Sequence, residues 1–131
     1  IRVVETRDAS IRDYTGSLRL NAKGTLGEHT VTGGVLGDSE IRITSVDDFP
    51  VNVAPTHHML FTLHRDMPGI IGRIGSQLGS FNVNIASMQV GRKIVRGDAV
   101  MVLSLDDPLP EGILAEIIKV PGIRDAYTVN L

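Results

Sequence analysis

Hydrophobic and polar residues alternate in three short runs within the first half of the chain. These runs predict strands, because successive side chains of a strand point to opposite faces of a sheet, and they cover residues 17–22, 29–34 and 40–47. No amphipathic helix is indicated before Ala54-Pro55-Thr56, which reads as a linker because proline disfavours continuing either kind of element. We therefore expect a mostly β domain over residues 1–54.

From residue 57 onward, runs with a period of two alternate with runs that repeat at three and four residues. Their order is strand, helix, strand, strand, helix, strand, at residues 57–64, 66–81, 84–90, 99–105, 107–120 and 123–131. A charged hairpin loop, residues 91–97, lies between the second and third of these strands. The order predicts an α+β fold: a ferredoxin-like βαββαβ domain over residues 57–131, with an antiparallel sheet and both helices on one face.

Each predicted helix carries an apolar stripe that should face the sheet. The stripe residues are Ile71, Ile74, Leu78 and Phe81 in the first helix and Ile113, Leu114, Ile117 and Ile118 in the second. The first helix follows Asp66-Met-Pro-Gly, which is typical of a helix start. Proline fits the first turn, and the aspartate can accept a hydrogen bond from an exposed backbone N–H there.

Three glycines, Gly72, Gly75 and Gly79, interrupt the first helix on one face. Each costs roughly 0.5–1 kcal/mol relative to alanine in a helix interior. A face without side chains allows another backbone to come close. Two interpretations of this neighbour are compatible with the sequence: the underlying sheet of the same domain, or the helix of a partner subunit.

Composition and charge exclude several classes of function. The net charge of −2 and the aromatic content of 4% provide neither a basic surface nor a stacking platform, so we expect no nucleic acid partner. There is no run of about 20 apolar residues and no signal peptide pattern, so we expect no membrane partner. The absence of cysteine excludes thiolate chemistry and fits a cytoplasmic protein. The first residues, IRVVET, already read as a strand, so we interpret the sequence as a fragment of a longer protein.

No pattern of residues indicates covalent or metal chemistry. His57 and His58 are neighbours on a predicted strand and therefore point to opposite faces, where they cannot hold one metal ion together. No nucleophile elbow, zinc-protease motif or phosphate-binding loop is present. We expect no catalytic residue and no metal site in this chain, which reads as a binding module.

The strongest candidate for a binding site is formed by His64 and Asp66, at the turn before the first helix, together with Asn84 after it. The helix start would suit a carboxylate, Asp66 would suit an ammonium group, and Asn84 would add an amide contact. A free α-amino acid carries both charged groups. The alternative from spacing alone is that Asp66 only caps its helix and Asn84 only closes a turn.

The strand at residues 85–90 should lie at an edge of the predicted sheet. An unpaired edge invites a second copy of the chain. A side-by-side dimer would join the two sheets, and the ligand turn of one subunit would then face Asn84 of its neighbour.

Two long stretches resemble the ACT domain at the C-terminus of the D-3-phosphoglycerate dehydrogenases. They are HMLFTLHRDMPGIIGRIGSQLGSFNVNIASMQVGR and GDAVMVLSLDDPLPEGILAEIIKVPGIRDAYTVNL, within residues 57–131. Residues 1–54 are similar to the end of the intervening (allosteric substrate-binding) domain of the long forms, and GRKIVRGDAV is closest to the cyanobacterial type.

The resemblance implies a regulatory, oligomerising fragment of an NAD-dependent enzyme that oxidises 3-phosphoglycerate in the first step of phosphorylated serine biosynthesis. It implies that NAD and the catalytic residues belong to the part before Ile1, that the ACT domains form a homodimer within a homotetramer, and that L-serine binds at their interface through His64, Asp66 and Asn84. Two alternatives remain open: the β chain of an iron–sulfur L-serine dehydratase, and a purely structural tetramerisation module without a ligand.

The resemblance also suggests an anion site in the first domain, since some intervening domains bind a phosphate-bearing anion through basic residues. Arg19 and Lys23 share one strand face, and Arg42 lies on a strand expected to be its neighbour. Guanidinium groups suit phosphate. Solvated surface charge is the alternative interpretation of these three residues.

Overall fold

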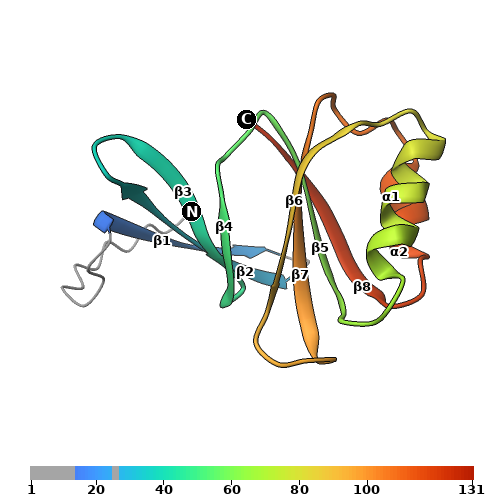
Figure 1. The fold of residues 1–131 in the computed structure, drawn as a ribbon, viewed down its shortest axis with the longest axis horizontal. Helices are drawn as coiled ribbons and strands as arrows, with labels where there is room; N and C mark the ends of the chain where they lie inside the picture. Colours follow the sequence, from blue (N-terminus) through green and yellow to red (C-terminus); the bar gives the residue numbers. More distant parts are fainter. Residues whose placement is uncertain (1–13, 25–26) are drawn as a thin grey trace. The chain divides into compact units, whose positions relative to one another are not determined.

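The computed structural model describes residues 14–24 and 27–131 (Figure 1). The chain divides after Pro55 into an N-terminal unit and a C-terminal unit, Thr56–Leu131.

The N-terminal unit is a four-stranded antiparallel sheet in which each strand pairs with the next one in sequence. Its strands are β1 (Tyr14–Gly24), β2 (Gly27–Leu36), β3 (Glu40–Val46) and β4 (Phe49–Val53). The first two contain the predicted runs 17–22 and 29–34, β3 covers the third run up to Val46, and β4 was not predicted. Proline at position 50 argues against a central strand, and β4 is indeed an edge strand, where a missing N–H donor is tolerated.

The turn between β3 and β4 shows how short polar residues shape this unit. Asp47 and Asp48 both have positive φ, 48° and 61°, as tight two-residue hairpin turns require. The Asp47 carboxylate accepts a hydrogen bond from the backbone N–H of Thr30 at 2.8 Å, and Asp48 pairs with Arg19 at 2.8 Å. These contacts tie the turn to β1 and β2.

The C-terminal unit has the predicted ferredoxin-like fold. Its elements are β5 (His58–Arg65), α1 (Ile70–Ser80), β6 (Ile85–Arg92), β7 (Asp98–Leu105), α2 (Ile113–Ile118) and β8 (Ile123–Asn130). The antiparallel sheet has the strand order β6-β7-β5-β8, and both helices cover one face (Figure 1). The predicted edge position of β6 is therefore confirmed.

The core of this unit lies between the sheet and the two helices. Its buried side chains come from β5, β7 and β8 on one side and from the helices and the segment after α1 on the other: Leu60, Ile74, Leu78, Val83, Met101, Leu103, Leu105, Ile113, Ile117 and Ala126. Full burial of such a side chain contributes about 1.5–3 kcal/mol. Aliphatic packing of this kind explains how a domain with so few aromatic residues forms a core.

The structure corrects part of the predicted helix faces. Ile71, Phe81 and Ile118 were expected to face inward, but they are 48%, 43% and 44% exposed. In α1 the buried residues are Ile70, Ile74 and Leu78, because the helix begins at Ile70 and this set shares one face. Phe81 lies beyond the last turn as the C-terminal cap residue. Leu114 is half-buried and packs against the core as predicted.

The expected capping role of Asp66 is also wrong. The N-terminal cap residue of α1 is Gly69, with φ of 84°, and no side chain caps the helix. Pro68 therefore lies before the helix and not in its first turn.

The glycines of α1 do not pack closely within the described chain. A Cβ atom added at Gly72, Gly75 or Gly79 would meet no described atom within 4 Å. The first of the two alternatives, close approach of the underlying sheet, is thus excluded for the described residues.

Candidate functional site

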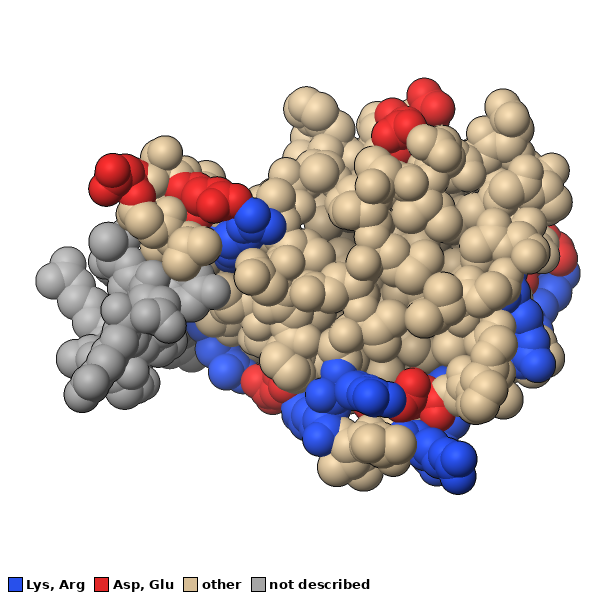
Figure 2. Space-filling model, in the orientation of Figure 1, with Lys and Arg blue, Asp and Glu red and all other residues tan. Residues whose placement is uncertain are grey.

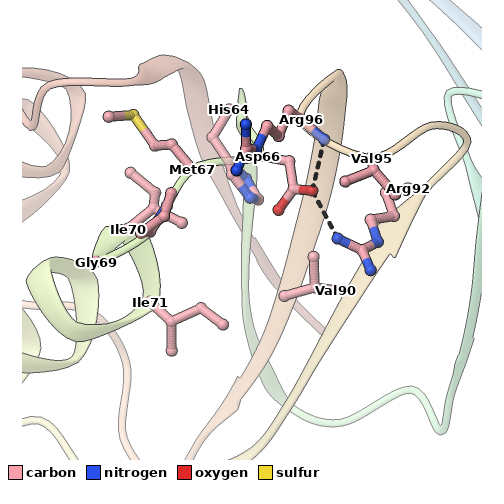
Figure 3. A pocket seen from close by; sticks show the side chains of 11 residues that line it. His64, Asp66, Met67, Gly69, Ile70, Ile71, Val90, Arg92, Val95 and Arg96 are labelled. Carbon is pink, nitrogen blue, oxygen red and sulfur yellow. Dashed lines mark hydrogen bonds and ion pairs between the residues drawn. The ribbon is translucent and has the colours of Figure 1, made fainter.

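A pocket of about 290 Å³ lies at the end of the C-terminal unit where β5 leads into α1 (Figure 3). Five segments line it: the end of β5, the turn after it, the start of α1, the end of β6 and the hairpin between β6 and β7. The lining residues are His64, Asp66, Met67, Pro68, Gly69, Ile70, Ile71, Val90, Arg92, Val95 and Arg96. Strands β5 and β6 are both antiparallel to β7, so their carboxyl ends lie at the same end of the sheet, on either side of the start of β7.

Asp66 is the central charged group of this pocket. Its Oδ2 accepts a hydrogen bond from the Arg92 guanidinium at 2.7 Å and another from the Arg96 backbone N–H at 3.1 Å, as Figure 3 shows. The hydrogen bond from Arg92 is the largest cause that lowers the pKa of Asp66, followed by that from Arg96. The carboxyl group therefore stays ionised at neutral and mildly acidic pH.

His64 is fully buried at the inner side of the pocket. Its Nδ1 lies 3.3 Å from Thr62 Oγ1, whereas its Nε2 has no hydrogen-bond partner within the described part of the chain. Burial lowers the pKa of His64, because the charged imidazolium loses its hydration, while Thr62 and the charge of Asp66 act in the opposite direction. A buried ring nitrogen without a partner is costly.

The start of α1 brings a partial positive charge to the same place. The helix has no side-chain cap and no acidic residue in its first turn, so its own side chains do not compensate the dipole. The site thus combines a carboxylate with a helix N-terminus and a buried imidazole.

Asn84 is not part of this pocket within one chain. It directly precedes β6, whereas the pocket involves Val90 and Arg92 near the other end of that strand. Its side-chain amide donates a hydrogen bond to Asp106 Oδ2 at 2.6 Å. Of the three predicted effector-binding residues, the structure of one chain brings together His64 and Asp66 only.

Arg92 is the residue of the site that the sequence reasoning missed. It was assigned to a hairpin loop, but it is the last residue of β6 and lies opposite Ala99 of β7. The predicted ferredoxin-like fold contained a usable signal, because it places the carboxyl ends of its first and second strands at the same end of the sheet. Figure 2 shows Lys and Arg side chains gathered around this hairpin, at the bottom of the view.

The three basic residues of the predicted anion site each pair with a carboxylate. Arg19 pairs with Asp48 at 2.8 Å, Lys23 with Glu28 at 3.8 Å, and Arg42 with Glu40. The strand register places Arg19, Lys23 and Arg42 on one face of the sheet. Their positive charges are thus largely compensated.

Among residues 14–24 and 27–131, no three His, Asp or Glu side chains are grouped in a way that would hold a metal ion. None of the helices in these ranges has the length and apolar character needed to span a membrane.

Comparison with known proteins identifies the C-terminal unit. Residues 58–122 match the family model described as the ACT domain. The C-terminal unit belongs to this family. ACT domains are associated in general with amino acid binding and dimerisation.

The whole chain is similar to part of several D-3-phosphoglycerate dehydrogenases. It is 76% identical over 131 residues to the protein of Synechocystis sp., of which it covers 24%, and 35% identical over 131 residues to that of Methanocaldococcus jannaschii, of which it covers 25%. The chain thus spans about a quarter of the length of these relatives and corresponds to their C-terminal part. The predicted resemblance is confirmed.

A relative of a different class is also found. The probable β chain of L-serine dehydratase from Bacillus subtilis is 31% identical over 110 residues, which is 84% of this chain and 50% of that protein. An alignment of 110 residues is longer than either unit, so the similarity extends over parts of both units.

Proposed function

We propose that this chain is a regulatory part of a cytoplasmic, NAD-dependent D-3-phosphoglycerate dehydrogenase, and that its ACT domain binds L-serine or a related small amino acid between two copies of the chain. The single observation that carries the ligand class is the pocket in which the ionised Asp66 faces the uncapped start of α1. The dehydrogenase assignment is supported by 76% identity along the whole chain to a relative of that name. NAD would bind in the part of such an enzyme that this chain does not cover.

The pocket has one element for each part of an amino acid zwitterion. The ammonium group would bind the Asp66 carboxylate, and the ligand carboxylate would lie at the N-terminus of α1. The volume of about 290 Å³ equals that of about ten water molecules, which suits a small amino acid.

A second copy of the chain would supply Asn84. Strand β6 is an edge strand, and two copies related by a two-fold axis would pair their β6 strands in antiparallel fashion. Antiparallel pairing brings the start of one β6 next to the end of the other. Asn84 of each copy would then approach the pocket of its partner, which supports an effector site shared between the copies, in a parent enzyme that is a homotetramer.

Isothermal titration calorimetry of the 131-residue chain with L-serine tests this proposal. We expect heat of binding that is lost in Asp66→Asn and in Asn84→Ala. Asp107→Asn and Asn130→Ala are matched controls on exposed residues outside the pocket, and they should bind like the wild type. No heat at millimolar serine in the wild type would refute the ligand and favour a purely structural module.

A mixing experiment tests whether the site is shared. When Asp66→Asn and Asn84→Ala chains are mixed in equal amounts, half of the dimers are mixed, and each mixed dimer has one site with both wild-type residues. About a quarter of the wild-type binding capacity should return. If Asp66 and Asn84 acted within one chain, mixing would restore nothing.

The second candidate, an L-serine dehydratase β chain, is favoured by the relative from Bacillus subtilis. The longer protein that contains this sequence separates the two. Reduction of NAD with 3-phosphoglycerate supports the dehydrogenase, whereas deamination of L-serine without NAD supports the dehydratase.

The anion site in the N-terminal unit remains a prediction. Because Arg19 and Arg42 are paired with Asp48 and Glu40, a phosphate-bearing anion would have to compete with these carboxylates. The double variant Arg19→Gln, Arg42→Gln should lose affinity for inorganic phosphate, and unchanged affinity would dispose of the site.

A further inference from the structure

The Asp66 carboxylate has two oxygens, and the described residues use only one of them. Both hydrogen-bond donors, the Arg92 guanidinium and the Arg96 backbone N–H, bind Oδ2, at 2.7 and 3.1 Å. No described residue donates to Oδ1. In Figure 3 this second oxygen points away from both donors, toward the side of the pocket formed by α1.

The orientation of Asp66 is fixed from several directions. Its backbone N–H donates to the carbonyl oxygen of Gly97 at 2.8 Å, so main chain and side chain are held by the same hairpin. Arg96, which provides one donor, has a positive φ of 60°, a conformation that needs support from its surroundings. A carboxylate held in this way has little freedom to turn its second oxygen elsewhere.

We infer that Arg92 is the positioning residue of the amino acid pocket: it holds one oxygen of Asp66 and so aims the other, in ionised form, at the ammonium group of the ligand. This inference rests on the proposed function. It assigns to Arg92 a role that its place in the sequence, within a charged hairpin, did not indicate.

The charges around Asp66 support this role. The titratable or charged side chains that line the pocket with it are His64 from β5, Arg92 from β6 and Arg96 from the hairpin, and α1 adds no acidic residue in its first turn. Burial favours neutral His64, so the hydrogen bonds from the Arg92 guanidinium and the Arg96 backbone N–H dominate. Arg92 is the largest cause of the lowered pKa of Asp66. Without Arg92, the carboxyl group would protonate at a higher pH and rotate more freely.

The test compares Arg92→Gln and Arg92→Lys with Arg124→Gln in the full 131-residue chain. Arg124 is a matched control, because it forms an ion pair with Asp98 at 2.8 Å and is 52% exposed, against 2.7 Å and 51% for Arg92 with Asp66. Two quantities are measured: the titration of the Asp66 carboxyl carbon by NMR, and the affinity for L-serine by calorimetry between about pH 4 and pH 8.

In Arg92→Gln we expect the titration midpoint of Asp66 to rise and serine to bind about tenfold more weakly at neutral pH. The loss of serine affinity on acidification should begin at higher pH than in the wild type, because Asp66 then protonates earlier. Arg92→Lys should restore the charge and part of the affinity, and Arg124→Gln should change neither quantity.

The outcomes are distinguishable. If the midpoint of Asp66 is the same in Arg92→Gln and the wild type, or if serine binds both with the same affinity and pH profile, the inference is overturned while the proposed function stands. If the wild type shows no heat with serine, the proposed function fails and the inference fails with it. A raised midpoint in that case identifies Arg92–Asp66 as a purely structural ion pair.

Discussion

The glycines of α1 lead to a prediction that separates the stability of one chain from its assembly. Gly72 and Gly75 lie inside α1 and Gly79 lies in its last turn, and a methyl group at each position would enter open space. Replacing each by alanine should therefore stabilise the monomer, because alanine restricts the unfolded chain and has the highest helix propensity.

The expected size follows from the helix propensities. Each Gly→Ala change should add up to about 1 kcal/mol to the free energy of unfolding, and the triple variant up to about 3 kcal/mol. For a domain of this size, 1 kcal/mol corresponds to roughly 4–8 °C in the melting temperature. Dimerisation should become weaker if the glycine face allows a partner helix to come close, since added methyl groups would separate the two backbones.

Urea denaturation at low protein concentration measures the first effect, and sedimentation velocity at tens of micromolar measures the second. Arg73→Ala is the control, because Arg73 is exposed on the same helix and points away from the face that carries the glycines. A loss of monomer stability in any single Gly→Ala variant would refute the reasoning from open space. Unchanged dimerisation in the triple variant would place the partner helix elsewhere.

Three further predictions concern single residues. Since Ile74 is fully buried, Ile74→Ala should cost about 2–5 kcal/mol in urea unfolding, whereas Ile71→Ala at a 48% exposed position should cost well below half of that. Gly122→Ala should lower the unfolding free energy by about 1–2 kcal/mol, because φ of 99° disfavours a side chain, and an unchanged melting temperature would contradict this. Because burial lowers the pKa of His64, the imidazole is protonated at a higher pH in the unfolded chain than in the folded one. The free energy of unfolding therefore falls as the pH drops below about 6.5, by at most about 1.4 kcal/mol per pH unit. His64→Leu should lack this component in urea unfolding at several pH values, and parallel pH–stability curves would show that His64 does not titrate in this way.

The candidate site was only partly predictable. His64 and Asp66 were found because they lie two residues apart in sequence, at a turn whose position follows from the strand and helix patterns around it. Arg92 was not found, since its partner Asp66 lies far away in the chain and the two meet only when β6 and β5 flank β7. The partner of Asn84 within the chain, Asp106, was missed for the same reason.

The sequence by itself determined the order of elements in the C-terminal unit and hence its ferredoxin-like fold. Periods of two and of three to four residues follow from backbone geometry, so they can be read locally. Only the tertiary structure decided that α1 begins at Ile70 and faces the sheet with Ile70, Ile74 and Leu78, that Asp66 binds Arg92 and does not cap the helix, and that β4 completes the first sheet. These outcomes depend on contacts between distant segments, where small differences in packing and hydrogen bonding select one of several locally acceptable arrangements.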